Sequence, residues 1–407
     1  MRAFFNLGLK KSSELFYIIN RGTMKNNKQL IYSIVEFLYF TILATMYGFA
    51  SLYLLDKGFS NSQIGLVLAL SSVLAIVLQQ VVAYFVKKTN YNLNRILVYL
   101  YIIVAILSLL IYVFKLSGIP FIIALIIVFF IEKGSEPFIT AIHSGYKEIQ
   151  FPISRGIGSL GYSISNFMVG QLLVRIASDY LPIIYFIPSI LIVVFLLIFK
   201  APNVAQEEKI KRQDKINLMH DYPHFYWFVF GISLISITHN FTELFLLQII
   251  TRINGTSANL GIAAALSAIT ELPAMALYKK YYKKLGNRNL LMFAGIMWVV
   301  KNILIAMSPN IYFVYACELL QFFSFSIYVP STERYLSHVI PKEEYLKGQA
   351  LISSALVVGG LIASLLGGVL IDKLGINIAL MIMQIFSIVG VIFFIISIKR
   401  SLKIAPR

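Results

Sequence analysis

Residues 62–86 read SQIGLVLALSSVLAIVLQQVVAYFV, an uncharged stretch that is long enough to cross a lipid bilayer as one helix. Part of this stretch recurs later in the chain, where 260–267 matches 64–71 at a constant offset of 196. Ile64-Gly65 corresponds to Leu260-Gly261, and the Ala-Leu-Ser at 69–71 recurs at 265–267. The lysine pairs that follow, Lys87-Lys88 and Lys283-Lys284, keep the same offset. A register that holds through an apolar span and its following loop indicates an internal duplication.

The composition excludes an ordinary soluble globule, because 58% of the 407 residues are hydrophobic and only 13% are charged. Apolar spans of about 20 residues follow one another along the chain. They form two sets of six, at 31–55, 62–86, 95–115, 119–145, 155–176 and 181–199, and at 223–250, 259–278, 289–307, 311–337, 345–371 and 375–398.

The excess charge of +17 lies in short basic runs between these spans, which favours a membrane topology over a nucleic-acid-binding surface. If the N-terminus is cytoplasmic, the outer loops hold five of the 35 basic residues and two lie within spans, which leaves 28 in the tails and inner loops. We therefore expect both termini to be cytoplasmic. The lone Cys317 excludes a disulfide framework and a cysteine metal site.

These observations predict an all-α membrane protein with twelve transmembrane helices in two pseudo-symmetric six-helix bundles, the major facilitator architecture, with a solute site between the halves. The expected organisation is a cytoplasmic tail, a bundle, a cytoplasmic linker, a second bundle and a short tail, at 1–30, 31–200, 201–222, 223–398 and 399–407. The tail has no signal-peptide core, and Met24 followed by Lys25 is an alternative translation start to Met1.

Four charged residues lie inside or at the edges of the fourth and fifth spans: Glu132, Lys133, Glu136 and Arg155. A charge in the hydrocarbon region costs at least about 2.5 to 3.5 kcal/mol, so such residues usually face a polar cavity and mark a transport path. A carboxylate accepts and a guanidinium donates several directed hydrogen bonds, so Glu136 and Arg155 together favour a hydroxyl-rich solute. The alternative is that this pair only locks two helices together, and Lys133 could neutralise either neighbouring acid.

Residues 156–161, Gly-Ile-Gly-Ser-Leu-Gly, satisfy the pattern of a dinucleotide-binding turn, but no strand precedes them. The glycines indicate close helix contacts instead, as do Gly360, Ser364 and Gly368 in the eleventh span. The sequence contains no hydrolase triad, metal cluster or Walker loop, so we expect neither an enzyme, nor a cofactor, nor an ATP-driven pump.

Helical spacing groups further polar residues. Arg155, Tyr162 and Asn166 recur at spacings of seven and four, and His239 and Glu243 at four, so each set shares one helix face, which we expect to line the cavity. A membrane histidine can instead hydrogen-bond a neighbouring helix. Two other acids, Glu318 and Glu333, lie nearer the span ends, and we expect them to meet water.

The run from Glu136 to Ile139, followed by the run from Arg155 to Tyr162, resembles the fourth and fifth helices of the lactose permease branch of the major facilitator superfamily, the oligosaccharide and nucleoside proton symporters. This resemblance implies that Glu136 and Arg155 pair and bind sugar hydroxyls, and that the aromatic at Tyr162, a tryptophan in the permease, stacks on the sugar ring. The spacing between the two runs is longer by one residue, which falls in a cytoplasmic loop.

The resemblance continues through most of residues 31–398. It implies that Asn240 replaces a cavity aspartate, that Glu243 retains a second acid, that Glu271 binds sugar and takes part in proton coupling, and that Lys301 is the partner of a coupling carboxylate. The tenth-span segment 321–330 lacks the histidine and the carboxylate that the permease uses for this coupling. The loop 83–95 also lacks the acid of the facilitator gating motif.

Proton coupling requires a carboxylate whose pKa changes as the site alternates between apolar and hydrated surroundings. This role falls to Glu271, Glu243, Glu136 or Glu132, and we favour Glu271, because Pro273 loosens its helix and Lys301 lies on the next span.

We therefore expect a multi-pass protein of the cell membrane, a proton-coupled symporter that moves a small polar solute, above all a saccharide, by alternating access. The expected partners are the solute, protons and the lipid bilayer, with no nucleic acid, and the expected state is a monomer. Alternatives are a nucleoside symporter, a drug or metabolite exporter and, more remotely, a lipid flippase or a non-transporting receptor.

Overall fold

The computed structural model describes residues 27–146, 149–199, 221–341 and 344–404. These residues form helices and connecting turns, with no strand among them. The expected N-terminal tail, including Met24, lies almost entirely outside the described residues, as do most of the linker 201–222 and the last three residues of the C-terminal tail.

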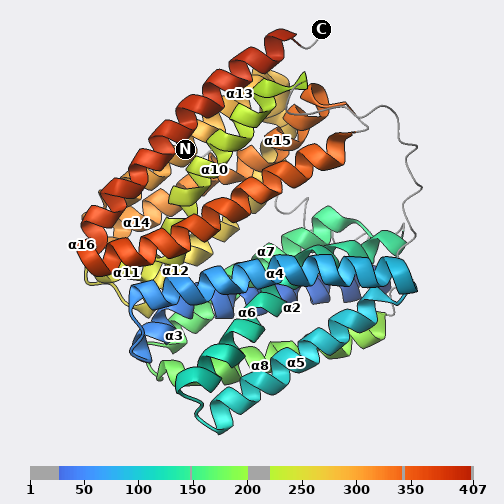
Figure 1. The fold of residues 1–407 in the computed structure, drawn as a ribbon, viewed down its shortest axis with the longest axis vertical. Helices are drawn as coiled ribbons and strands as arrows, with labels where there is room; N and C mark the ends of the chain where they lie inside the picture. The colour runs from blue at the N-terminus through green and yellow to red at the C-terminus, as the bar shows by residue number, and fades with distance from the viewer. Residues whose placement is uncertain (1–26, 147–148, 200–220, 342–343, 405–407) are drawn as a thin grey trace, which may run out of the picture.

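The first bundle comprises the helices before the linker (Figure 1). They are α2 (Asn27–Gly48), α3 (Ala50–Asp56), α4 (Asn61–Thr89), α5 (Leu93–Val113), α6 (Gly118–Ala141), α7 (Phe151–Leu172) and α8 (Leu181–Phe199), with short 3₁₀ turns η1 (Ile142–Gly145) and η2 (Ser178–Tyr180).

The second bundle follows the linker. It comprises α10 (Pro223–Leu244), α11 (Leu246–Thr251), α12 (Ser257–Ile269), α13 (Glu271–Ala306), α14 (Ile311–Glu318), η3 (Leu319–Phe322), α15 (Phe325–Val339) and α16 (Tyr345–Ile404). Both α13 and α16 contain two helices, because the backbone leaves helical geometry at Gly286 and at Gly375.

Eight stretches of the described residues are long and apolar enough to cross a membrane, and two of them contain these divided helices. Dividing the two stretches at Gly286 and Gly375, and adding the 22-residue helices α7 and α10, gives twelve helical passages in the described part of the chain. The predicted twelve-helix, all-α membrane fold is thus confirmed.

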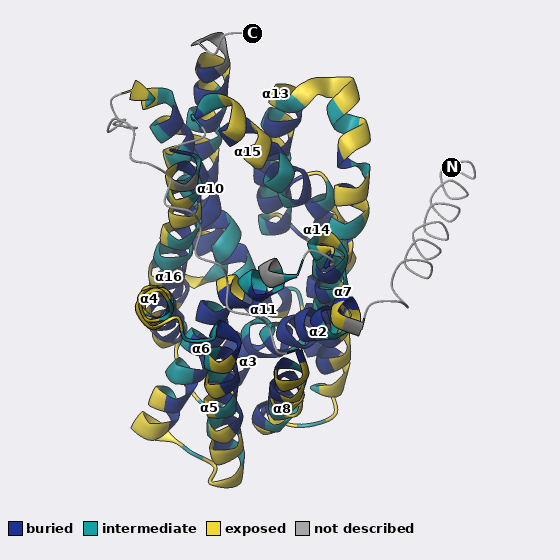
Figure 2. Cartoon of the chain, turned by 90° about the vertical axis from the view of Figure 1, so that its right-hand side faces the viewer, coloured by how far each residue is buried: buried dark blue, intermediate teal, exposed yellow. Residues whose placement is uncertain are grey.

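The outer surface of both bundles is apolar. Figure 2 shows exposed residues along the outward sides of the helices. Large hydrophobic side chains are exposed there, among them Val77, Met168, Ile187 and Met381, the last at 71%. A surface of this extent cannot face water in a stable monomer and requires the hydrocarbon of a bilayer.

The internal duplication extends to the helix boundaries. The first and seventh passages are interrupted at Phe49 and Phe245, and 245 minus 49 is again 196. After these breaks, α4 and α12 begin at Asn61 and Ser257, at the same offset. Each start is capped alike, because the backbone N–H of Ser60 donates to the Gln63 side chain at 2.9 Å and that of Thr256 to the Asn259 side chain at 2.8 Å.

Each half crosses the other at one of these repeated helices. α4 packs on the first part of α16, and α12 packs on α7. A Cβ atom added to Gly65 would lie 2.0 Å from the carbonyl oxygen of Ser364, and one added to its repeat partner Gly261 would lie 2.2 Å from that of Asn166. The backbones therefore approach too closely for any side chain at either glycine.

The two bundles meet at one end and diverge toward the other (Figure 1). Hydrogen bonds join them where they meet: the Ser51 hydroxyl donates to the carbonyl of Leu244 at 2.7 Å, and the Gln248 side chain donates to that of Asn61 at 2.8 Å. We call this end, with these four residues and Asp372, the closed face. It lies opposite the ends of α8 and α10 that flank the linker.

Candidate functional site

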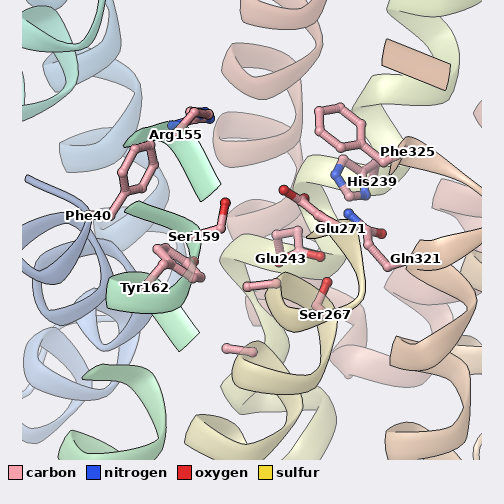
Figure 3. A pocket seen from close by; sticks show the side chains of 12 residues that line it. Phe40, Arg155, Ser159, Tyr162, His239, Glu243, Ser267, Glu271, Gln321 and Phe325 are labelled. Atoms are coloured by element: carbon pink, nitrogen blue, oxygen red, sulfur yellow. The ribbon is translucent and has the colours of Figure 1, made fainter. Parts of the chain in front are cut away.

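A cavity of about 290 Å³ lies between the two bundles (Figure 3). Its walls come from α2 and α7 of the first bundle and from α10, α12, α13, η3 and α15 of the second. The lining residues are Phe40, Arg155, Ser159, Tyr162, His239, Glu243, Ala264, Ser267, Ala268, Glu271, Gln321 and Phe325.

The first-bundle wall carries Arg155, Ser159 and Tyr162, which share one face of α7 at spacings of four and three (Figure 3). The Arg155 guanidinium lies 4.1 Å from the centre of the Phe40 ring, a cation–π arrangement. Its nearest nitrogen lies 3.8 Å from a carboxylate oxygen of Glu136, beyond hydrogen-bonding distance, and the two side chains are 37% and 50% exposed. Arg155 lines the cavity and Glu136 is not among its lining residues, but both groups keep hydrogen-bonding capacity for a third molecule.

The second-bundle wall carries His239, Glu243 and Glu271 opposite them. The His239 ring is fixed by aromatic neighbours, stacked on Phe325 at 5.8 Å and edge-on to Trp298 at 5.0 Å. Its Nδ1 is buried and has no hydrogen-bond partner among the described residues.

The eighth passage is interrupted beside Glu271. α12 ends at Ile269 and α13 begins at Glu271. Pro273 has no N–H to donate to the carbonyl of Ile269, so the helical ladder is broken there. The expected loosening of the backbone around Glu271 is thus present in the structure.

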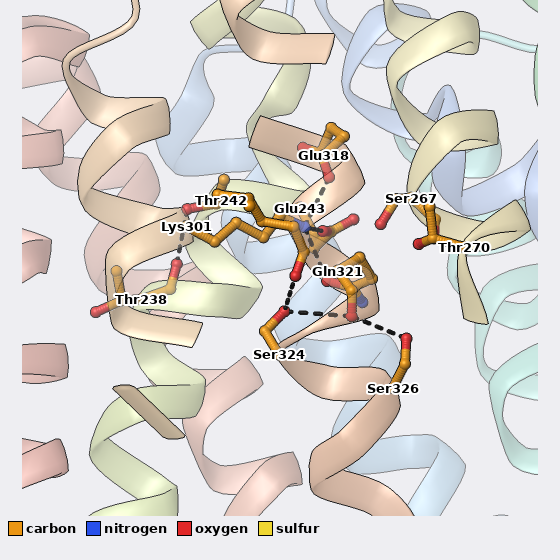
Figure 4. A network of polar contacts seen from close by, with 11 residues as sticks. Thr238, Thr242, Glu243, Ser267, Thr270, Lys301, Glu318, Gln321, Ser324 and Ser326 are labelled. Carbon is orange, nitrogen blue, oxygen red and sulfur yellow. Dashed lines mark hydrogen bonds and ion pairs between the residues drawn. The ribbon is translucent and has the colours of Figure 1, made fainter. Parts of the chain in front are cut away.

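An ion cluster lies behind this wall (Figure 4). The Lys301 ammonium is 2.6 Å from Glu318 and 3.6 Å from Glu243, and it donates to the side-chain oxygen of Gln321 at 2.9 Å. Lys301 and Glu318 are buried, at 0% and 1% exposure, whereas Glu243 is 34% exposed and reaches the cavity. We call Lys301, Glu318 and Glu243 the ion cluster.

The position of Glu318 corrects two expectations. This acid does not meet water, because its side chain is 1% exposed. It is the eighth residue of α14, which places it roughly 10 Å from the helix start. It also supplies a tenth-span carboxylate, three residues before the segment 321–330 in which one was expected to be missing. The ion pairs of Lys301 in the described structure are with Glu318 and Glu243, not with Glu271.

Two expected cavity residues, Asn166 and Asn240, lie elsewhere. The Asn166 amide donates to the carbonyl of Tyr162 at 2.9 Å, and its oxygen faces Gly48 on α2. The Asn240 amide donates to the carbonyl of Ser236 at 2.8 Å and faces Gly360 of α16. In this structure both side chains lie in helix contacts rather than at the cavity, which corrects the expectation that they line it.

Glu132 and Lys133 lie deep in the first bundle. Glu132 is fully buried, and both of its carboxylate oxygens have no hydrogen-bond partner among the described residues. Lys133 donates to the Ser72 hydroxyl at 2.8 Å, so its hydrogen bond goes to a neighbouring helix. Neither residue lines the cavity.

Several residues at or near the cavity were not predicted from the sequence. Glu36 is buried in α2 and accepts a hydrogen bond from the Tyr32 hydroxyl at 2.6 Å. Its signal was available, since Glu36 is the one charged residue of the span 31–55. No pattern in the sequence distinguishes the others, Phe40, Ser159, Ser267, Gln321 and Phe325, from residues that pack. The described His, Cys, Asp and Glu side chains form no group of three suited to a metal ion.

A family model described as "MFS_1 like family" matches residues 29–382. The chain is similar to a maltose permease of Geobacillus stearothermophilus, with 26% identity over 247 residues, which are 60% of this chain and 62% of that protein. It is also similar to the uncharacterized transporter YwbF of Bacillus subtilis strain 168, with 22% identity over 240 residues, 58% of this chain and 59% of that protein. The matched region thus spans about six-tenths of each relative.

Solved structures share the fold. The nucleoside transporter NupG superposes with a TM-score of 0.75 at 15% identity, over 93% of this chain and 100% of that chain. A bacterial homologue of the human lysosomal transporter Spinster, solved inward-facing and unoccupied, superposes with a TM-score of 0.67 at 13% identity. The superposition covers 93% of this chain and 98% of that chain. At these identities the likeness concerns the fold alone.

Proposed function

Because the chain belongs to the MFS_1 like family, we propose that it is a secondary active transporter that moves a small polar solute across the cell membrane by alternating access. The cavity between two bundles joined at one face supports this proposal, since solute sites of such transporters lie between repeated halves. We place both termini in the cytoplasm, so this conformation is open toward the cytoplasm. Both cavity walls come from one chain, which supports a monomer as the working unit.

We propose a saccharide as the solute, and the carrying observation is the unfinished pairing of Arg155 with Glu136. At 3.8 Å, with both side chains partly exposed, the guanidinium and the carboxylate can each bind a hydroxyl placed between them. Acids on the other wall, Glu243 and Glu271, add acceptors for hydroxyl hydrogens. The cavity volume of about 290 Å³ is at the lower end of the range for small-molecule pockets, which begins at about 300 Å³.

A nucleoside is the second candidate, favoured by the aromatic side of the cavity. His239 and Phe325 line it as a stacked pair with an interplanar angle of 19°, and Tyr162 lines the opposite wall. Aromatic faces of this kind bind a planar base by stacking.

We further propose that protons drive uptake and that Glu271 carries the coupling proton, with Glu243 as the second candidate. Glu271 lines the cavity at a break in its passage. Glu243 shares Lys301 with Glu318, so two carboxylates compete for one buried ammonium. A proton bound at Glu243 would leave Lys301 paired with Glu318 alone, which gives the cluster two charge states.

Reconstituted protein tests these assignments with maltose, glucose and uridine as probes. Arg155→Lys keeps the charge but loses the planar fork, and Glu136→Gln loses the anionic acceptor, so each variant should weaken binding of the accepted probe about tenfold or more. Arg175→Lys and Glu333→Gln, at exposed positions away from the cavity, are the matched controls. Near-normal affinity in both site variants would reduce the pair to helix packing.

The proton assignment is tested in the same vesicles. Glu271→Gln keeps an amide oxygen that can accept a hydroxyl hydrogen, so it should still exchange the accepted probe, but it should lose uphill accumulation driven by a pH gradient. Uphill accumulation by this variant would move the role to Glu243 or another acid, and a parent protein that ignores pH gradients would be a uniporter or use another ion. Scrambling of a labelled lipid without uptake of any probe would support a flippase instead.

A further inference from the structure

Gln321 lies between the buried ion cluster and the cavity. It belongs to η3, the 3₁₀ segment that separates α14 from α15, and its side chain is 4% exposed. It lines the cavity and also contacts Lys301. Its backbone carbonyl accepts a hydrogen bond from the Ser326 hydroxyl at 2.8 Å, which ties the segment to the start of α15 (Figure 4).

The charge of Lys301 fixes which way the Gln321 amide points. An ammonium group can only donate hydrogen bonds, so the amide atom at 2.9 Å from it must be the oxygen. The amide nitrogen, with two donors, is therefore turned away from the ion cluster. On that side lies the cavity, which Gln321 shares with the carboxylate of Glu271, an acceptor (Figure 3).

These contacts link the buried Glu318 through Lys301 to Gln321, which lines the cavity together with Glu271. We propose that Gln321 is a positioning residue that couples the state of the ion cluster to the orientation of Glu271. The inference rests on the proposed transport function and deepens it, because it states how the cluster and the solute site affect each other.

An amide suits this role because it has no titratable proton. Gln321 transmits the position of Lys301 but takes up no charge itself. It offers Glu271 a neutral donor, while Lys301 forms its ion pairs in the described structure with Glu318 and Glu243. A shift of Lys301 between its two acids moves the amide oxygen, and with it the donor offered to Glu271.

The backbone around Gln321 allows such movement. The tenth passage is interrupted over η3, and α15 resumes only at Phe325. A 3₁₀ stretch within a helical passage often marks a hinge. Interrupted helices also form the substrate and ion sites of many transporters. The interruption falls on the segment that contacts both Lys301 and the cavity.

A double-mutant cycle on thermal unfolding tests this chain without requiring transport. Glu318→Gln, Glu271→Gln and the double variant are each made in the parent protein and again in a Gln321→Met background. In the parent, the changes in apparent Tm should depart from additivity by about 2 °C or more. In the Gln321→Met background they should add. Gln384→Met, at a buried glutamine of α16 outside the cavity, is the matched control and should leave the coupling unchanged.

Two results overturn the proposal: additive effects in the parent, or the same non-additivity after Gln321→Met, which would indicate direct electrostatic interaction between the acids. If Gln321→Met does not fold, Gln321→Glu replaces it, since an ionised glutamate still accepts from Lys301 but cannot donate to Glu271.

A transport measurement separates positioning from a purely structural role. In vesicles, Gln321→Met should reduce pH-driven accumulation at least tenfold more than it reduces exchange of the accepted probe. Equal losses of exchange and accumulation would overturn the positioning role. If the parent moves none of maltose, glucose and uridine, the proposed solute classes fail, while the unfolding cycle still decides whether Gln321 couples the two acids.

Discussion

Asp372, in α16 of the second bundle, accepts hydrogen bonds from both the backbone N–H and the hydroxyl of Ser62, at 2.7 and 2.5 Å, in the first turn of α4. The other carboxylate oxygen accepts from the backbone and the side-chain amide of Asn61, at 3.0 and 2.9 Å. One bundle thus supplies the anion that caps a helix N-terminus of the other, where free N–H groups and the helix dipole both favour negative charge. This contact holds the closed face together.

Replacing Asp372 should therefore open the closed face. In Asp372→Asn the charge is lost and one of the acceptor oxygens becomes a donor, so we expect the population opened at this face to rise several-fold to about tenfold. Spin labels on cysteines introduced at Asp56 and Met307, in a Cys317→Ser background, would report the change as a longer distance population. Lys373→Gln, at the next and exposed residue, is the control; an unchanged distance distribution in Asp372→Asn would contradict a latch.

Side chains at the helix crossings should have the same effect by a steric route. Gly65→Ala and Gly261→Ala each place a Cβ atom about 2 Å from a backbone carbonyl oxygen of the other bundle, and a backbone cannot move aside as a side chain can. We expect a lower apparent Tm and a larger opened population in both variants. Gly360→Ala, whose nearest neighbour is the Asn240 side chain at 3.2 Å, should change little. Comparable effects at all three glycines would argue against a specific crossing.

Loss of Lys301 should destabilise the fold strongly. Lys301→Met leaves the carboxylate of Glu318 buried without its partner, and breaking a buried ion pair costs about 3 to 5 kcal/mol. The double variant Lys301→Met with Glu318→Gln should recover much of that loss. Thermal unfolding in detergent measures both. Lys347→Met breaks a pair with Glu344 in which the lysine is 64% exposed, so it should cost only about 0 to 1 kcal/mol. A small loss of stability in Lys301→Met would mean that water enters the ion cluster.

The proposed orientation places the closed face outside the cell and the opposite end of the bundles, near the linker, in the cytoplasm. A cysteine at Met307, which is 72% exposed beside the closed face, should react with a membrane-impermeant thiol reagent added outside intact cells. A cysteine at Ser337, exposed near the end of α15, should react only after the cells are opened. The buried Cys317 is replaced by serine in both variants. The reverse pattern would place the termini outside.

The sequence alone determined the membrane class, the number of passages and the duplication. Each of these depends on local properties: the length of an apolar stretch relative to the bilayer, and a register of 196 residues that recurs at Gly65 and Gly261. The sequence also indicated that Glu136 and Arg155 belong near one cavity, because charges in apolar spans need a polar environment. The structure brings these two side chains within 3.8 Å of each other.

Only the tertiary structure decided which polar residues reach the cavity. Asn166 shares a helix face with Arg155 and Tyr162, but it lies farther along α7, where its backbone meets Gly261 and the bundles are already in contact. Asn240 follows His239 by one residue, and a rotation of about 100° turns it toward α16. Glu318 and Lys301 meet because consecutive passages run antiparallel and α14 ends beside the break at η3. Spacing along one helix predicts a shared face, but what that face contacts depends on how the other helices pack against it.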